Sequence, residues 1–127
     1  MSDGTIAIAD DHAPTRWVLG ELLRGDGWTV LEARDGLELL ECASANRLDV
    51  VVTDLGMPRM GGLRAARALR ERPDRTVGLM IAITGRKLTP EQEAEVDLVF
   101  DRVLRKPVHP RELRGELRRG LRARESR

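Results

Sequence analysis

A chain of 127 residues with a formal net charge of +1 and 34% charged side chains lacks the charge excess that draws proteins to nucleic acid or to anionic membranes. It has no apolar run near the roughly 20 residues that span a bilayer, and its first residues do not form a signal peptide. Cys42 is the only cysteine, so no internal disulfide can form and a reducing compartment is expected. These features predict a soluble, cytoplasmic protein.

The first apolar stretch, Thr5–Ala9, reads as a buried strand and stops at the acidic pair Asp10-Asp11. A helix is expected next, from about Thr15 to Arg24. Its apolar residues recur at helical spacing and predict one buried stripe of Val18, Leu19, Leu22 and Leu23. A second strand, from Trp28 to Ala33, alternates only modestly, which favours an edge position in a sheet.

The central strand is the strongest signal in the chain. Three consecutive valines run into Thr53 and Asp54, and a Gly and a Pro follow directly, which is typical of a strand buried on both faces that ends abruptly. A helix from Asp35-Gly36 to about Asn46 precedes it. The inward positions predicted for that helix are Leu37, Leu40 and either Ala43 or Ser44.

A third helix from about Leu63 to Arg72 and a fourth strand from Val77 to Ile83 come next, and the strand stops at Thr84-Gly85. Thr89 and Gln92 form a capping box around Pro90, which predicts the start of a short fourth helix. That helix has few apolar residues, so we expect it to be weakly anchored. The remaining predicted elements are a fifth strand that ends at Lys106 and a last helix that begins near His109-Pro110.

Strands that alternate with helices in this way predict an α/β fold with a doubly wound, five-stranded parallel sheet. Ligands bind at the carboxyl ends of such strands. Three carboxylates, a hydroxyl and an ammonium would meet there: Asp10, Asp11, Asp54, Thr84 and Lys106. A hard cation such as Mg²⁺ relieves repulsion between carboxylates. A carboxylate beside a metal, a hydroxyl and a lysine is suited to accept a phosphoryl group.

With these residues in this order, the chain resembles the receiver domains of two-component response regulators, the CheY-like superfamily. The resemblance covers almost the whole chain, and its motifs are Asp10-Asp11, Thr-Asp-Leu-Gly-Met-Pro around Asp54, Thr84-Gly85 and Lys106-Pro107. It implies a flavodoxin-like sheet of order 2-1-3-4-5. It also implies one receiver domain over residues 1–127, which signals through altered protein contacts and is not itself an enzyme.

The resemblance gives each of these residues a role. Asp54 would take a phosphoryl group from a phosphohistidine on a sensor histidine kinase or a histidine phosphotransfer protein. Thr84 would hydrogen-bond a phosphoryl oxygen, and Lys106 would pair first with Asp54 and then with the phosphoryl oxygens. The peptide bond from Lys106 to Pro107 would be cis. The implied ligands of Mg²⁺ are Asp10, Asp11, Asp54 and the backbone carbonyl of Gly56.

Two positions bear on signalling. Receivers usually carry an aromatic residue three positions before the lysine, where this chain has Val103. We therefore expect the switch to act through residues 85–88 and the fourth helix.

Arg86 and Gly56 each lie two residues beyond a site residue, and in the family such positions flank the route of the hydrolysing water. Arg86 over the phosphoryl group would make self-dephosphorylation slow.

Other interpretations remain open at this stage. The missing aromatic favours a receiver fold that binds partners without phosphorylation. An aspartate-nucleophile phosphatase would need an acid where this chain has Gly56.

We interpret His12 as a loop residue and Cys42 as a small apolar residue. The last helix and tail carry seven arginines, which we interpret as a solvated face rather than a nucleic-acid contact. A homodimer through the fourth helix, fifth strand and fifth helix is a further possibility, and the chain could be a stand-alone protein or part of a larger one.

Overall fold

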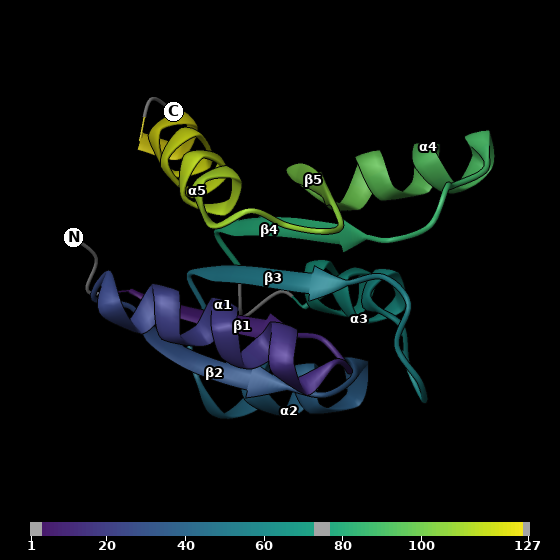
Figure 1. Cartoon of the computed structure of the whole chain (residues 1–127). Helices are drawn as coiled ribbons and strands as arrows, with labels where there is room; N and C mark the ends of the chain where they lie inside the picture. The colour runs from purple at the N-terminus through teal and green to yellow at the C-terminus, as the bar shows by residue number, and fades with distance from the viewer. Residues whose placement is uncertain (1–3, 73–76, 126–127) are drawn as a thin grey trace.

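The computed structural model describes residues 4–72 and 77–125, and strands alternate with helices throughout these ranges (Figure 1). The strands are β1 (Thr5–Ala9), β2 (Thr29–Ala33), β3 (Val50–Asp54), β4 (Leu79–Thr84) and β5 (Arg102–Arg105). The helices are α1 (Ala13–Gly25), α2 (Gly36–Ala45), α3 (Gly62–Arg70), α4 (Pro90–Val99) and α5 (Pro110–Glu125). The predicted α/β alternation is confirmed.

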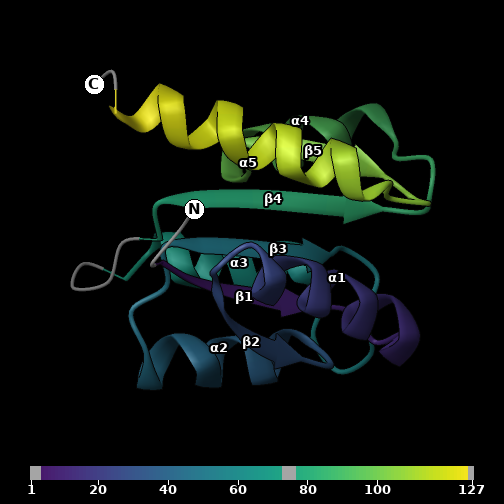
Figure 2. The same ribbon diagram turned by 60° about the vertical axis from the view of Figure 1, so that its left-hand side comes forward.

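The described strands form one parallel sheet of order β2-β1-β3-β4-β5, as predicted. Val51 at its centre pairs with Ala7 of β1 and with Met80 of β4. Every residue of β3 and of β4 is buried, which explains their continuous apolar runs, because helices cover both faces of a parallel sheet. The strands run in one direction, so their carboxyl ends and the loops that follow lie along one edge (Figure 2).

Side chains that alternate along each strand feed two separate cores. One lies under α1 and α5, and the other lies under α2, α3 and α4 (Figures 1 and 2). The first includes Ile6, Ile8, Leu19, Leu23, Val50, Val52, Ile81, Ile83, Leu113 and Leu117. The second includes Ala7, Ala9, Leu39, Ala43, Val51, Ala66, Leu69, Met80, Val96 and Phe100.

Three details of the helices differ from the prediction. α1 begins at Ala13, two residues early, because the ring of His12 caps it by accepting the backbone N–H of Thr15. Val18 is 51% exposed, so it lies outside the buried stripe of α1. In α2 the buried positions are Leu39 and Ala43, whereas Leu37 is exposed. The position of the α2 cap sets the rotation of the helix, and the apolar spacing alone was compatible with more than one rotation.

The fourth helix is lightly anchored, as its composition suggested. Its capping box is present, with Thr89 and Gln92 bonded to each other's backbone N–H. Of the ten residues Pro90–Val99, all of them described, only Val96 is buried. Arginines of α3 contribute exposed contacts: Arg67 pairs with Glu95, and Arg70 bonds the carbonyl of Val99.

The two tryptophans differ in exposure. Trp17 on α1 is 59% exposed, whereas Trp28, just before β2, is buried in the core under α1 and α5.

Within the described residues, no helix has the length and apolarity to cross a membrane.

Candidate functional site

Three aspartates meet where β1 and β3 end. Asp10, Asp11 and Asp54 each present a carboxylate oxygen within 4.8 Å of those of the other two. Asp10 and Asp54 are buried, and Asp11 is exposed. The cause is topological, since β1 and β3 are hydrogen-bonded neighbours that end in the same register. The structure thus brings together the acidic residues that the sequence singled out.

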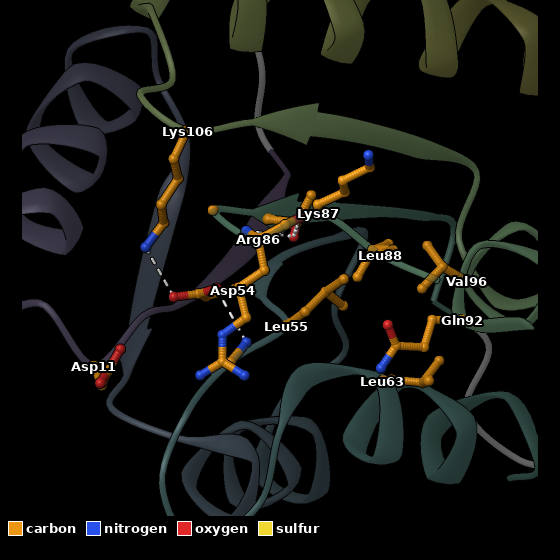
Figure 3. Close-up of a pocket in the computed structure, with 13 residues that line it drawn as sticks. Asp11, Asp54, Leu55, Leu63, Arg86, Lys87, Leu88, Gln92, Val96 and Lys106 are labelled. Carbon is orange, nitrogen blue, oxygen red and sulfur yellow. Dashed lines mark hydrogen bonds and ion pairs between the residues drawn. The ribbon is translucent and has the colours of Figure 1, made fainter. Parts of the chain in front are cut away.

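Lys106, directly after β5, supplies the nearest positive charge. Its ammonium lies 2.8 Å from Oδ2 of Asp54 (Figure 3). It also lies 3.3 Å from Oδ2 of Asp10. Burial of the ammonium opposes its charge, but the hydrogen bond to Asp54 and the charges of both aspartates outweigh burial and raise the pKa of Lys106. The lysine is therefore protonated at neutral pH. The peptide bond to Pro107 is cis, as the resemblance implied.

Asp10 has an oxygen suited to a cation. Its Oδ1 accepts the backbone N–H of His12 at 2.9 Å, but its buried Oδ2 accepts no hydrogen bond from the described residues. The ammonium of Lys106, 3.3 Å away, balances the negative charge of that oxygen but does not donate a hydrogen bond to it. Buried carboxylate oxygens without a donor are costly. Hard cations such as Mg²⁺ take carboxylate and carbonyl oxygens as ligands, so this oxygen-only donor set fits the ion.

Thr84 ends β4 beside the aspartates and is buried. Its hydroxyl donates to the carbonyl of Arg86 at 3.0 Å and accepts the N–H of Arg86 at 3.2 Å. A Cβ built on Gly85 would lie 3.5 Å from Cδ of Lys106. The small residue thus leaves space beside the lysine, while the threonine hydroxyl is held by its own loop.

The loop from β3 to α3 holds the Asp54 carboxylate from the other side. The N–H of Gly56 donates to Oδ1 of Asp54 at 3.1 Å. A Cβ on Gly62 would lie 2.2 Å from the Asp54 carbonyl oxygen, and one on Gly61 would lie 2.8 Å from the Leu55 carbonyl oxygen. This glycine pair directly precedes the third helix that the sequence predicted, from about Leu63. Two adjacent glycines could have indicated this close packing from the sequence, because glycine is common where backbone segments approach closely.

A cavity of about 470 Å³ opens over Asp54. Asp11 and Lys106 line its polar end, and it continues to an apolar end lined by Leu63, Leu88 and Val96 (Figure 3). This apolar end was not anticipated from the sequence, because its residues come from three separate segments.

Arg86 reaches over this cavity. Its Nε and Nη2 lie 3.8 Å from where a Gly56 Cβ would be. Figure 3 shows its side chain passing close to Asp54, while that of Lys87 extends away. The guanidinium thus lies over the loop that follows β3.

A second cavity, of about 270 Å³, lies between α4 and β5. It shares Thr84, Leu88 and Val96 with the first cavity, and Val103 lines its far side. Val103 is 38% exposed. Space therefore remains where receivers usually carry an aromatic ring, and this space adjoins the site.

Two other reactive side chains have different roles. His12 is the N-cap of α1, in keeping with its interpretation as a loop residue. Cys42 is half-buried against the core under α2, and burial, followed by the charges of Glu38 and Glu41, raises the pKa of its thiol. A protonated thiol is a poor nucleophile.

Comparison with known proteins identifies the family. Residues 6–118 match the response regulator receiver domain, and the chain belongs to this family of two-component signalling domains. It is 34% identical to the aerobic respiration control protein ArcA of Escherichia coli K12 over 89% of this chain and 46% of ArcA. It is 36% identical to the response regulator MprA of Mycobacterium ulcerans over 92% of this chain and 50% of MprA. The chain thus spans about half the length of these relatives.

Among solved structures, the chemotaxis response regulator CheY4 of Vibrio cholerae superposes with a TM-score of 0.83 at 29% identity, covering 92% of this chain and 98% of CheY4. This likeness supports both the fold and the family.

Proposed function

We propose that the domain is phosphorylated on Asp54, in a Mg²⁺-dependent reaction, by a sensor histidine kinase or a histidine phosphotransfer protein. The observation that carries the proposal is the setting of one carboxylate. Asp54 is buried at a strand end, held by Gly56 and Lys106, flanked by two further aspartates, and faces an open cavity. A carboxylate in such a cluster is a candidate nucleophile.

Each neighbour has a defined part in the transfer. An oxygen of Asp54 attacks the phosphorus, the bond to the donor nitrogen breaks, and an acyl phosphate forms. Lys106, already paired with Asp54, then pairs with a phosphoryl oxygen. Asp10, Asp11, Asp54 and the carbonyl of Gly56 would hold Mg²⁺, which would neutralise charge between the carboxylates and the phosphoryl oxygens.

Signalling would start at Thr84. To bond a phosphoryl oxygen, its hydroxyl must leave Arg86, and that frees the loop before α4. The loop borders a cavity and leads into α4, in which only Val96 is buried among the described residues Pro90–Val99. A helix anchored so lightly is the element that this release would move. Amide exchange across residues 85–99 should change on phosphorylation. Unchanged exchange there would contradict this route.

Partner contacts are proposed for two surfaces. Trp17 and Val18 leave the exposed side of α1 partly apolar. Val18 also lines a cavity together with Gly85 and Lys106, so this side suits the histidine-bearing partner. The face of α4, β5 and α5 suits a homodimer, since it presents acidic residues such as Glu93 on α4 and basic ones such as Arg105 and Arg118 on β5 and α5. We further propose a cytoplasmic protein that acts as a switch and not as an enzyme, with the described fold as its receiver domain.

Intact mass after incubation with a small-molecule phosphodonor tests the proposal. The wild type should gain one phosphoryl group only with Mg²⁺, and Asp54→Asn should gain none. Asp97→Asn, which removes an exposed carboxylate on α4, is the matched control and should still be phosphorylated. A folded wild type without any adduct would instead favour a receiver fold that binds partners without phosphorylation.

A further inference from the structure

Arg59, in the loop between β3 and α3, has an unusual backbone. Its φ is +64°, the left-handed region that side chains other than glycine rarely adopt. Such strain persists only where neighbouring contacts over-determine the conformation, and it concentrates at functional sites. The contacts that hold Arg59 are therefore of interest.

The contact is an ion pair with Asp35, whose side chain is only 3% exposed. Nε of Arg59 donates to Oδ2 of Asp35 at 2.6 Å, and Nη2 contacts the same oxygen. The other oxygen, Oδ1, accepts the N–H of Glu38 and so caps α2. Because the cap uses Oδ1, the capping of α2 does not require Arg59. The side chain of Arg59 is itself 56% exposed.

A second bond joins the same two segments. The N–H of Gly36 donates to the carbonyl of Met60 at 2.8 Å. A Cβ on Gly36 would lie 2.7 Å from that carbonyl oxygen, so the approach requires glycine. Two consecutive residues at the start of α2 thus hold two consecutive residues of the loop.

The loop carries this restraint to the acceptor. Within it, the N–H of Met60 donates to Pro58 at 2.7 Å, and the N–H of Gly62 donates to Leu55 at 3.2 Å. These bonds close the loop between Arg59 and Gly56. Gly56 in turn donates to Oδ1 of Asp54. A displacement of Arg59 is therefore transmitted to the hydrogen bond that orients the acceptor carboxylate.

The neighbouring loop is braced against the same region. Arg16 of α1 donates to the carbonyl of Asp10 at 2.7 Å and to Oε1 of Glu32 on β2 at 3.1 Å. The N–H of Asp10 donates to Ala33 at 3.0 Å. Residues 32–36 therefore anchor both segments that bear the acidic oxygens.

We propose that Asp35 and Arg59 are positioning residues, which fix the loop so that Gly56 orients Asp54 and completes the cation site. Neither residue touches the reacting atoms. The proposal rests on the proposed function and adds residues to it that act only through the loop. Partners of this outer kind commonly change metal affinity by ~10–100-fold when they are removed.

The test is a Mg²⁺ titration of the full chain, followed through the amide resonances of Gly56 and Gly85. Arg59→Gln should raise the dissociation constant about tenfold. Its phosphorylation rate at saturating Mg²⁺ should also fall, because the same loop orients the Asp54 carboxylate through Gly56. Arg47→Gln removes the same charge from an exposed site before β3, at the opposite edge of the sheet, and should bind Mg²⁺ like the wild type.

Further variants separate positioning from folding. Arg59→Gly relieves the left-handed strain but lacks the guanidinium, so it should bind weakly, whereas Arg59→Lys should recover part of the affinity. Asp35→Asn keeps a good cap for α2 and should weaken binding as Arg59→Gln does. The double variant should be no weaker than either single one, since both remove one interaction.

Equal Mg²⁺ affinity of Arg59→Gln and Arg47→Gln would overturn the inference and leave the proposed function standing. A wild type that binds no Mg²⁺ and gains no phosphoryl group would overturn both.

Discussion

Two loops leave neighbouring central strands at the same edge of the sheet, and they are held very differently. The loop from β3 to α3 is fixed by Gly61 and Gly62 against backbone and by Arg59 against Asp35. The loop from β4 to α4 makes a local bond pair between Thr84 and Arg86 and borders two cavities. The first loop is thus held by contacts to other segments, whereas the second makes a local bond pair beside two cavities.

This difference matches two tasks that the proposed function requires and that conflict within one loop. Orienting a carboxylate for group transfer requires fixed geometry, whereas reporting the transfer requires an element that can change position at low cost. Separate loops allow both. The following experiments would break or sharpen this contrast, beginning with the largest expected effect.

Gly62→Ala should be severely destabilising. The new Cβ would lie 2.2 Å from the Asp54 carbonyl oxygen and 2.8 Å from Oγ1 of Thr53. Overpacking of this kind costs about 1–3 kcal/mol and occasionally more, and we expect the upper end because a backbone atom is in the way. Urea unfolding measures the loss. The control is Gly25→Ala, where a Cβ meets nothing within 4 Å; it should be neutral or slightly stabilising. A tolerated Gly62→Ala would mean that the first loop is not rigid.

Arg86→Ala should shorten the lifetime of the phosphorylated domain several-fold, equivalent to roughly 1 kcal/mol of barrier. Arg86 lies over Gly56 and passes close to Asp54 (Figure 3), so its loss should open the approach of water to a phosphoryl group on Asp54. Loss of phosphate over time, followed by intact mass, is the measurement. Lys87→Ala removes the neighbouring charge and should leave the lifetime unchanged. Equal lifetimes for Arg86→Ala and the wild type would exclude a shielding role.

Val103→Phe should fill part of the 270 Å³ cavity and stabilise the domain by about 1 kcal/mol. Amide exchange in α4 should slow at the same time, because Val96 would gain a packing partner. Leu98→Phe, at a position 88% exposed, adds a ring without filling a cavity and should change stability little. Destabilisation by Val103→Phe would show that the second loop is already well packed.

The smallest expected effect concerns acid stability. The N–H of Glu38, opposed by burial and helped by Arg59, lowers the pKa of Asp35. A carboxyl group with a lowered folded pKa stabilises the fold above its unfolded pKa, ~3.9, and this stabilisation is lost as the pH falls through the folded value. Urea midpoints between pH 5 and 3 should therefore fall less steeply in Asp35→Asn than in the wild type. Parallel curves would indicate that Asp35 adds no acid-labile stability.

Much of the site follows from one rule about strands. Asp54 and Thr84 were placed because each ends a continuous apolar run, and parallel strands bring such ends together. The strand order came with the family resemblance. The sequence could not predict contacts between side chains that are far apart along the chain. Arg59 contacts Asp35 only because the sheet places α2 beside the β3–α3 loop. The exposure of Leu37 and the space beside Val103 likewise depend on helix rotation and packing.

The placement of the two tryptophans has an optical consequence. The chain has no tyrosine, so its ultraviolet emission comes almost wholly from Trp17, which is solvated, and Trp28, which is buried. Trp17→Phe would leave one indole that reports on the core, and its emission should shift to longer wavelength on unfolding. Trp28→Phe would leave one indole on the outer side of α1, a built-in fluorophore for whatever docks there.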